Sequence, residues 1–212
     1  MKKLLIATNN KGKVEEIQEL LKDLDIELVT PADIGLKLDV VEDGKTYAEN
    51  AGKKAVAFAH ASRLISLADD SGLEVDALDG APGLYSARYG PPLALPPFLP
   101  KMGGDGGGWT DADRRAYLLQ NLQNKPRPWT AHFHAAIAIA APDKAAQFAQ
   151  GQCHGKIIPE ERGTGGFGYD PIFFFPKLGW TMAELNMDEK NRLSHRARAI
   201  INAKPIIKKI FA

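Results

Sequence analysis

The first thirty residues change from an apolar run to an amphipathic stretch and back to an apolar run. Residues 4–8 form the first run, and apolar side chains then recur at positions 14, 17, 20, 21 and 24 with the spacing of a helix. Residues 26–30 form the second run. The pattern predicts a strand, a polar turn, a helix and a strand, which is how an α/β fold begins. Ligands of such folds gather at the carboxyl ends of strands, and the turn at residues 8–13 occupies that place.

A capping pattern predicts the next helix. Thr46 followed by Glu49 matches a capping box, and apolar side chains at positions 47, 51, 55 and 58 then form the stripe of a buried helix face. Asn50 and Lys54 share another face of this helix because they are four residues apart.

Two adjacent aspartates follow the next apolar run. Residues 64–68 predict a strand, and Asp69-Asp70-Ser71-Gly72 comes directly after it, so we expect the strand to end there with its polar groups at the carboxyl end. Neighbouring side chains on a strand point to opposite faces. We therefore expect Asp69 and Asp70 to have different roles.

The rest of the chain predicts further strands and two helices. Strand-like segments occur at residues 131–140, 145–150 and 171–175. Thr110 with Asp113 starts a helix that buries positions 117, 118 and 122, and Ser194 caps a closing helix in which Pro205 predicts a kink or a break. Residues 91–108 hold five prolines followed by five glycines, which indicates an exposed loop.

Composition narrows the class of protein. The 212 residues are 44% hydrophobic and carry a formal net charge of +1 without a polybasic block. One domain with a single good core is expected, and a nucleic-acid binder that tracks phosphates is not. Cys153 is the one cysteine, which fits a reducing cytoplasm. The apolar start stops at residue 7, so it reads as a strand and not a signal peptide, and no run is long enough to span a membrane.

A glycine-rich run at residues 163–168 is the most informative single stretch. It contains Phe167 and is followed by Tyr169, Asp170 and an apolar strand-like segment. Successive backbone N–H groups in such a run can converge on phosphate oxygens, and a flanking aromatic ring can stack on a purine. A dinucleotide-binding Gly-x-Gly-x-x-Gly turn is excluded because the run precedes a strand and the first strand-to-helix turn lacks the glycines.

The charged residues at the predicted strand ends suit a nucleoside polyphosphate. Carboxylates among Glu42, Glu49, Asp69 and Asp70 could hold Mg²⁺, which prefers oxygen ligands together with substrate phosphates. Glu49 could equally serve only as the capping-box acid. Positive charge to neutralise a polyphosphate is available from Lys13, Lys54, Lys190 and Arg196, and Ser194-His195-Arg196 opens a helix whose N-terminus would favour an anion.

Several of these segments, taken in order from residue 4 to about residue 210, resemble the Ham1/inosine triphosphatase family of non-canonical purine nucleoside triphosphate pyrophosphatases. The matching motifs are Thr8, Asn10 and Lys13; Glu49-Asn50 with Lys54; Ala-Asp-Asp-Ser-Gly-Leu at 68–73; Gly-Ala-Pro-Gly-Leu-Tyr-Ser-Ala-Arg-Tyr at 80–89; the run at 163–173; and Ser194-His195-Arg196. Two features depart from the family. The segment at residues 91–108 is longer than the usual link, and Val41 stands where relatives often have a second acid.

The resemblance implies an α/β fold in which a mixed sheet is flanked by helices, as one domain over residues 1–212 with two lobes and a central cleft. It implies Mg²⁺-dependent hydrolysis of ITP, dITP and XTP to the monophosphate and pyrophosphate, by a protein that is commonly a homodimer. Asp70 would be the general base and would hold Mg²⁺ with Glu42. The substrate-binding residues that it implies are Thr8, Asn9, Asn10, Lys11, Gly12, Lys13, Lys54, Ser71, Phe167, Gly168, Tyr169, Asp170, Lys190, His195 and Arg196, the last two near the base.

Two alternatives remain open from the sequence. A related pyrophosphatase could prefer another nucleotide, such as a methylated pyrimidine triphosphate. A non-catalytic nucleotide sensor could keep the fold and use the loop at residues 91–108 to bind a partner, although the intact Asp69-Asp70 pair argues against this.

Overall fold

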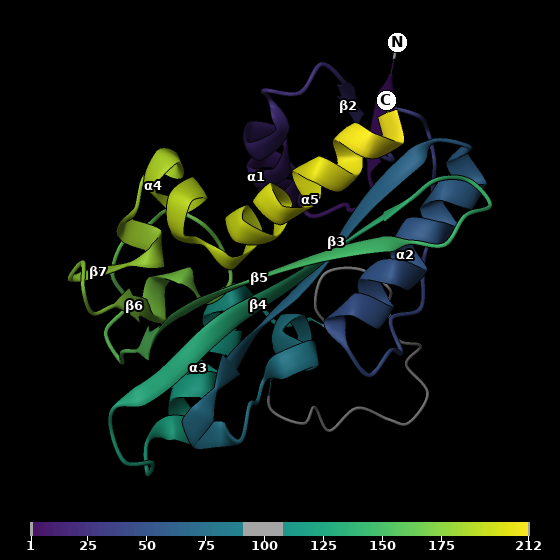
Figure 1. Cartoon of the computed structure of the whole chain (residues 1–212). Helices are drawn as coiled ribbons and strands as arrows, with labels where there is room; N and C mark the ends of the chain where they lie inside the picture. The colour runs from purple at the N-terminus through teal and green to yellow at the C-terminus, as the bar shows by residue number, and fades with distance from the viewer. Residues whose placement is uncertain (1, 91–107, 212) are drawn as a thin grey trace. The chain divides into compact units, whose positions relative to one another are not determined.

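The computed structural model describes residues 2–90 and 108–211. The predicted exposed loop at residues 91–108 lies outside the described residues, apart from Gly108. The helices and strands are β1 (Lys3–Ile6), α1 (Lys11–Leu21), β2 (Glu27–Val29), α2 (Tyr47–Ser62), β3 (Ile65–Val75), α3 (Asp111–Leu122), β4 (Trp129–Ala140), β5 (Gln147–Ile157), β6 (Phe173–Phe175), β7 (Trp180–Thr181), α4 (Met187–Leu193) and α5 (His195–Phe211). Figure 1 shows these elements along the chain.

Within the described residues, seven strands form one mixed sheet in the order β2-β1-β3-β4-β5-β6-β7. β1 pairs in parallel with β2 and β3, whereas β6 pairs antiparallel with β5 and β7. The chain divides into two compact units. The first comprises Met1–Ser71, His134–Gln152 and Asn191–Ala212, and the second comprises Gly72–Phe133 and Cys153–Lys190. The predicted α/β class with a mixed sheet flanked by helices is confirmed.

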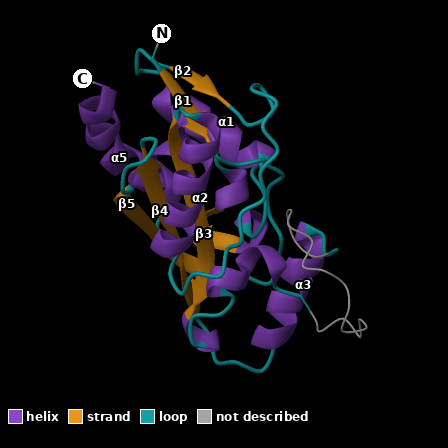
Figure 2. Ribbon diagram, turned by 90° about the vertical axis from the view of Figure 1, so that its right-hand side faces the viewer, coloured by secondary structure: helices purple, strands orange, loops and turns teal. Residues whose placement is uncertain are grey.

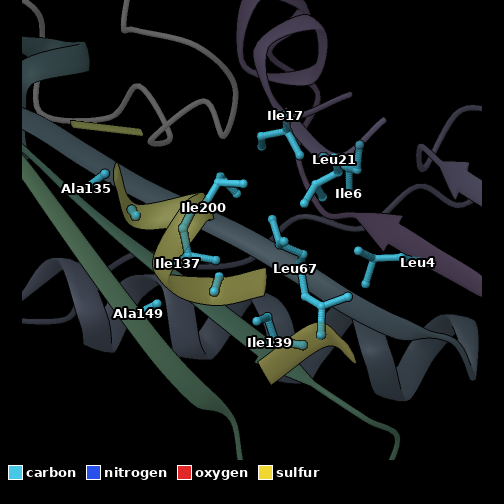
Figure 3. Close-up of a cluster of buried hydrophobic side chains, with 13 residues drawn as sticks. Leu4, Ile6, Ile17, Leu21, Leu67, Ala135, Ile137, Ile139, Ala149 and Ile200 are labelled. Carbon is cyan, nitrogen blue, oxygen red and sulfur yellow. The ribbon is translucent and has the colours of Figure 1, made fainter. Parts of the chain in front are cut away.

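The core of the first unit lies between the sheet and the helices α1 and α5. Figure 3 shows Ile17 and Leu21 of α1 and Ile200 of α5 directed at Leu67 of β3 and at the β4 side chains. All of these residues are fully buried, and removing such apolar surface from water stabilises the fold by about 25 cal/mol per Å². α1 and α5 therefore share one face of the sheet.

The opposite face of the sheet in this unit is covered by α2. Figure 2 shows α2 in front of β3 and β4, while Figure 1 shows α1 and α5 on the other side of these strands. The predicted apolar stripe of α2 is buried, and Gly52 allows the helix to lie close to Phe148, whose ring a Cβ at this position would meet at 3.1 Å. Each face of β3 therefore meets different helices.

Several predicted boundaries need correction. β3 does not end before Asp69 but continues to Val75, because Leu73 and Val75 are buried in the second unit and extend the apolar pattern. β5 continues past residue 150 to Ile157 for the same reason, since Cys153 and Ile157 are buried. α5 runs through Pro205 without the break that the sequence allowed, and its apolar face continues to the buried Ile207. A kink at Pro205 stays a prediction.

Two capping predictions have different outcomes. Thr110 and Asp113 form the full capping box of α3. At α2, the Thr46 hydroxyl accepts the hydrogen bond from the Glu49 N–H, but the Glu49 carboxylate accepts from the Lys45 N–H instead of from Thr46. No helix in the described part of the chain is both long and apolar enough to cross a bilayer.

Candidate functional site

The turn after β1 shapes the start of α1. The Thr8 hydroxyl accepts a hydrogen bond from the Asn10 N–H (3.2 Å), and the Asn10 side chain caps α1 by accepting from the Lys13 N–H (3.0 Å). No acidic residue occupies the first turn of α1, where Lys11 and Gly12 lie, and Asn9 is exposed. A helix N-terminus of this kind favours an anion because its first N–H groups point outward and the helix dipole is positive there.

Asp69 lies at the centre of a buried charge network. One of its carboxylate oxygens accepts the Lys13 ammonium at 2.7 Å, the Ser71 hydroxyl at 3.1 Å and the Arg196 guanidinium at 3.4 Å. Burial alone would raise the pKa of Asp69, but Arg196 and Lys13 hold the pKa well below the usual carboxyl range. Asp69 is therefore a fixed negative charge.

Arg196 joins α1, β3 and α5. Its guanidinium forms an ion pair with Glu16, donates to the Ser71 hydroxyl at 3.0 Å and is 2% exposed. Two carboxylates inside the first unit thus stabilise its charge. Burial alone would lower the pKa of Arg196, but Asp69 and Glu16 raise it above the usual value. The neighbouring His195 is also buried, and Ser194 caps α5 by accepting from the Ala197 N–H, as predicted.

Asp70 has a different environment on the opposite face of β3. Its carboxylate accepts a hydrogen bond from Asn50 of α2 at 3.1 Å, and the Lys54 ammonium lies 3.7 Å away. Burial raises the pKa of Asp70, Lys54 and Lys13 lower it, and the nearby Glu42 raises it again, with the balance above the ordinary value. The expectation that the two aspartates point to opposite faces is met, because Asp69 contacts α1 and α5 while Asp70 contacts α2.

Lys54 connects the carboxylates on this face. Its ammonium lies 3.0 Å from Glu42 and donates to the Asp69 backbone carbonyl at 2.9 Å, in addition to its approach to Asp70. Burial would lower its pKa, but Asp70 and Glu42 raise the pKa above its usual value, so the ammonium remains charged. Glu42 and Asp70 are therefore neighbours that share one cation.

The glycine-rich run is organised within the second unit by a buried ion pair. Asp170 accepts the Lys190 ammonium at 2.7 Å and the Phe167 N–H at 3.0 Å, and the same ammonium lies 5.1 Å from the centre of the Phe167 ring. Gly166 has φ +71°, and a Cβ there would meet the Asp170 carboxylate at 2.1 Å. The loop therefore needs glycine at this position to wrap around Asp170.

The residues that follow Phe167 are anchored to the second unit. The buried Tyr169 donates its hydroxyl proton to the Ser86 backbone carbonyl at 2.9 Å, and burial raises the pKa of that hydroxyl. The Ser86 hydroxyl in turn accepts from the Leu73 N–H at 2.9 Å. Phe167 and Gly168 remain half-exposed, whereas Tyr169 and Asp170 are buried. Phe167 and Gly168 are thus the accessible part of this segment.

The structure groups the predicted site residues by unit. The first unit brings together the turn at residues 8–13, Glu42, Lys54, residues 69–71, His195 and Arg196, and the second unit brings together residues 167–170 and Lys190. Glu49, which the sequence left open between a cap and a metal ligand, accepts from the Lys45 N–H.

Sequence reasoning missed the roles of three residues and the partner of a fourth. Glu16 is a buried carboxylate three residues after Lys13, and only this shared helix face signals its role. Asn50 was placed on the correct face of α2, but its contact with Asp70 depends on how α2 packs on β3. Asp111 and Arg115 of α3 bind the backbone of Gly168, and no motif indicated this.

Comparison with known proteins gives a consistent result. Residues 4–206 match the Ham1 family. A dITP/XTP pyrophosphatase of Desulforamulus reducens is 44% identical over 210 residues, which are 99% of this chain and 97% of the relative, and one of Listeria monocytogenes is 44% identical over 94% of this chain and 92% of the relative. The fold matches the Ham1 protein of Coxiella burnetii with a TM-score of 0.83, 37% identity and coverage of 99% and 100%. The Staphylococcus aureus Ham1 protein matches with a TM-score of 0.80, 36% identity and coverage of 98% and 99%. Nearly full-length agreement in sequence and fold shows that this chain belongs to the Ham1 family.

Proposed function

We propose that this chain is a Mg²⁺-dependent pyrophosphatase that hydrolyses dITP, XTP and ITP to the nucleoside monophosphate and pyrophosphate. The relatives described above are named for dITP and XTP. Hydrolysis of such triphosphates keeps deaminated purines out of nucleic acids. The observation that supports this proposal most strongly is the different surroundings of two adjacent carboxylates. Lys13 and Arg196 pair with Asp69, whereas the buried Asp70 accepts a hydrogen bond from Asn50 and has the Lys54 ammonium 3.7 Å away. The pKa of Asp69 is accordingly lowered and that of Asp70 is raised. Environments that separate two pKa values in this way are typical of acid–base catalysis.

Asp70 is the proposed general base. Its carboxylate would take a proton from a water molecule as the water oxygen bonds to the α-phosphorus, while the bond from that phosphorus to the pyrophosphate oxygen breaks. Because the pKa of Asp70 lies above the ordinary carboxyl value, this carboxylate is a stronger base than an exposed aspartate. Asn50 donates a hydrogen bond to one oxygen of this carboxylate and so holds the carboxylate in place.

Positive charge near Asp70 suits a polyphosphate. Lys54 lies beside Asp70, Lys13 lies in the first turn of α1, and the N–H groups of that turn supply further donors. These groups would bind the triphosphate and stabilise the negative charge that moves onto the leaving pyrophosphate. Thr8 and Asn10 would act by fixing the shape of the turn.

The residues present fit a magnesium ion. Glu42 and Asp70 place carboxylate oxygens around the same Lys54 ammonium, so this position already favours a positive charge. No three His, Cys, Asp or Glu side chains converge as a ready metal site among residues 2–90 and 108–211. Two carboxylates with the remaining ligands taken from phosphate and water are the usual way in which proteins bind Mg²⁺. When bound, the ion would neutralise phosphate charge and polarise the phosphoryl oxygens.

The base is assigned to the half-exposed aromatic loop. Phe167 is half-exposed and offers a ring face for stacking on a purine. Selectivity for a 6-oxo purine would require hydrogen-bond donors aimed at that oxygen. Adenine carries an amino group at that position and would leave such donors unpaired. The family resemblance placed His195 and Arg196 near the base. Both are buried, and the Arg196 guanidinium contacts Asp69 and Ser71.

The test is pyrophosphate release from a panel of ITP, XTP, dITP, GTP, ATP and a pyrimidine triphosphate, with Mg²⁺ and with chelator. Metal-dependent release from ITP, XTP and dITP alone is the expected result. Preference for a methylated pyrimidine triphosphate would move the chain to a different pyrophosphatase. Binding of ITP without pyrophosphate release would identify a nucleotide sensor instead.

The same proposal includes a cytoplasmic homodimer. The family resemblance supports the dimer. The single cysteine, Cys153, is buried and supports a reducing compartment. Light scattering of the purified chain measures the mass, and a value near one chain, 23.1 kDa, would exclude the dimer.

A further inference from the structure

The backbone of Gly168 is held from both sides by one helix. Its N–H donates to the Asp111 carboxylate at 2.7 Å, and its carbonyl accepts from the Arg115 guanidinium at 2.8 Å. Asp111 and Arg115 are four residues apart on α3, so they share one helix face. Both polar groups of a single residue are therefore fixed by two charged side chains on a rigid element.

The two clamping side chains are themselves fixed. Arg115 also binds Glu161 with two parallel hydrogen bonds of 2.9 and 2.8 Å, and its side chain is only 12% exposed. The second oxygen of Asp111 pairs with Arg114, which also donates to the Trp109 carbonyl at 2.6 Å. Bidentate pairing of arginine with a carboxylate fixes the orientation of the guanidinium. The clamp is thus a network with little freedom of its own.

The loop needs such support because its glycines allow the backbone many conformations. Gly166 and Gly168 both have positive φ, and Gly165 lies beside them. Glycine backbones have many accessible conformations, so ordering this loop loses more conformational entropy than ordering an ordinary segment. Hydrogen bonds from α3 and the Asp170–Lys190 pair restrict the loop on either side of Phe167.

We propose that Asp111 and Arg115 are positioning residues for nucleobase recognition, which act by fixing the Gly168 peptide and thereby the ring of Phe167. This inference rests on the proposed function, in which Phe167 stacks on the base. A ring that is already in its binding position loses less freedom when the base docks, so the benefit appears in substrate affinity. The chemistry at Asp70 lies in the other unit and does not require the clamp.

The experiment compares Arg115→Lys and Asp111→Ala with Asp113→Ala in the full chain. Lysine keeps the charge at position 115 but cannot bind Glu161 and Gly168 in the manner of a planar guanidinium. Asp113 lies in the same first turn of α3, and its carboxylate accepts hydrogen bonds from Thr110. Removing this carboxylate therefore weakens the start of the helix and leaves the hydrogen bonds to Gly168 in place. The measurements are KM and kcat for ITP, the Mg²⁺ concentration for half-maximal rate at saturating ITP, and Tm.

Loss of a charge-assisted hydrogen bond predicts a KM for ITP that rises roughly tenfold in both clamp variants. We expect kcat and the Mg²⁺ midpoint to stay within about twofold of the wild type, because the clamp variants change none of the residues proposed to bind phosphate or Mg²⁺. Asp113→Ala should lower Tm without raising KM. An unchanged KM in Arg115→Lys, or an equal rise in Asp113→Ala, would overturn the inference. Failure of the proposed function is distinguishable, since the wild type would then release no pyrophosphate from ITP.

Discussion

Asp69 and Asp70 are adjacent on β3, yet Lys13 and Arg196 bind the carboxylate of Asp69 while Asn50 and Lys54 of α2 contact that of Asp70. The first carboxylate sits among paired cations and is held ionised. The second is buried with weaker compensation, so its pKa is raised. Of these two adjacent residues, Asp69 is therefore a structural charge and Asp70 a candidate base.

Replacement of the proposed base tests the mechanism directly. Asp70→Asn should lower kcat for ITP by at least about a hundredfold, because the amide cannot accept the proton from water. Nucleotide binding, measured by calorimetry with chelator present, should persist. The matched control is Glu49→Gln, an exposed acid at the start of α2, which should retain full activity. Full turnover in the Asp70 variant would refute its role.

The same substitution at the two adjacent positions should change stability in opposite directions. Asp70 has a folded-state pKa above the unfolded value of 3.8, so ionising it at neutral pH opposes folding, and Asp70→Asn should raise Tm at pH 7. Asp69 has a lowered pKa, and Asp69→Asn leaves Lys13 and Arg196 without their buried partner, which should destabilise the fold by roughly 3 kcal/mol. Thermal unfolding of both variants measures this, and equal shifts of the same sign would contradict it.

Acid should remove the contribution of Asp69 to the stability of the fold, but it should not remove that of Asp70. A lowered folded-state pKa gives stability that is present above the unfolded value of 3.8 and is lost as the pH falls through the folded pKa. The raised pKa of Asp70 gives the reverse, with stability present below 3.8 and lost as the pH rises through the folded pKa. The Tm difference between wild type and Asp69→Asn should therefore shrink below pH 3.8. A difference that is constant with pH would show that the charge of Asp69 is not the cause.

The acid limb of the pH–rate profile should move in opposite directions when the neighbours of Asp70 are neutralised. Burial raises the pKa of Asp70, Lys54 lowers it and Glu42 raises it. Lys54→Gln should therefore shift the limb of kcat/KM to higher pH, and Glu42→Gln should shift it to lower pH, whatever each variant does to the maximal rate. Limbs that do not move would exclude Asp70 as the group that titrates.

Gly151 of β5 should tolerate no side chain. A Cβ there would meet the His195 carbonyl oxygen and the Ala199 nitrogen of α5, both at 2.4 Å, so Gly151→Ala must push the helix away from the strand. Overpacking of this kind destabilises by about 1–3 kcal/mol, which chemical denaturation would detect. The adjacent Gln152→Ala keeps the backbone carbonyl that accepts from Arg198 and should be nearly neutral.

Most of the helices and strands, and the residues that cap the helices, could be predicted from the sequence, whereas β7 and α4 were not predicted. Helical spacing at positions 14, 17 and 21 predicted α1, Thr110 and Asp113 predicted the cap of α3, and the alternation of a strand predicted that Asp69 and Asp70 face opposite ways. These features depend on residues within a few positions of each other, so a linear pattern contains them.

The partners of the charged side chains depend on long-range packing and could not be predicted from the sequence. Arg196 reaches Asp69 across 127 positions and Glu16 across 180, and Asp111 reaches Gly168 across 57. The direction of a buried pKa shift depends on these distant neighbours and on burial, which no local pattern encodes. The end of β3 was mispredicted for the same reason, because the burial of Leu73 and Val75 in the second unit extends the strand past the polar Asp69–Ser71 segment.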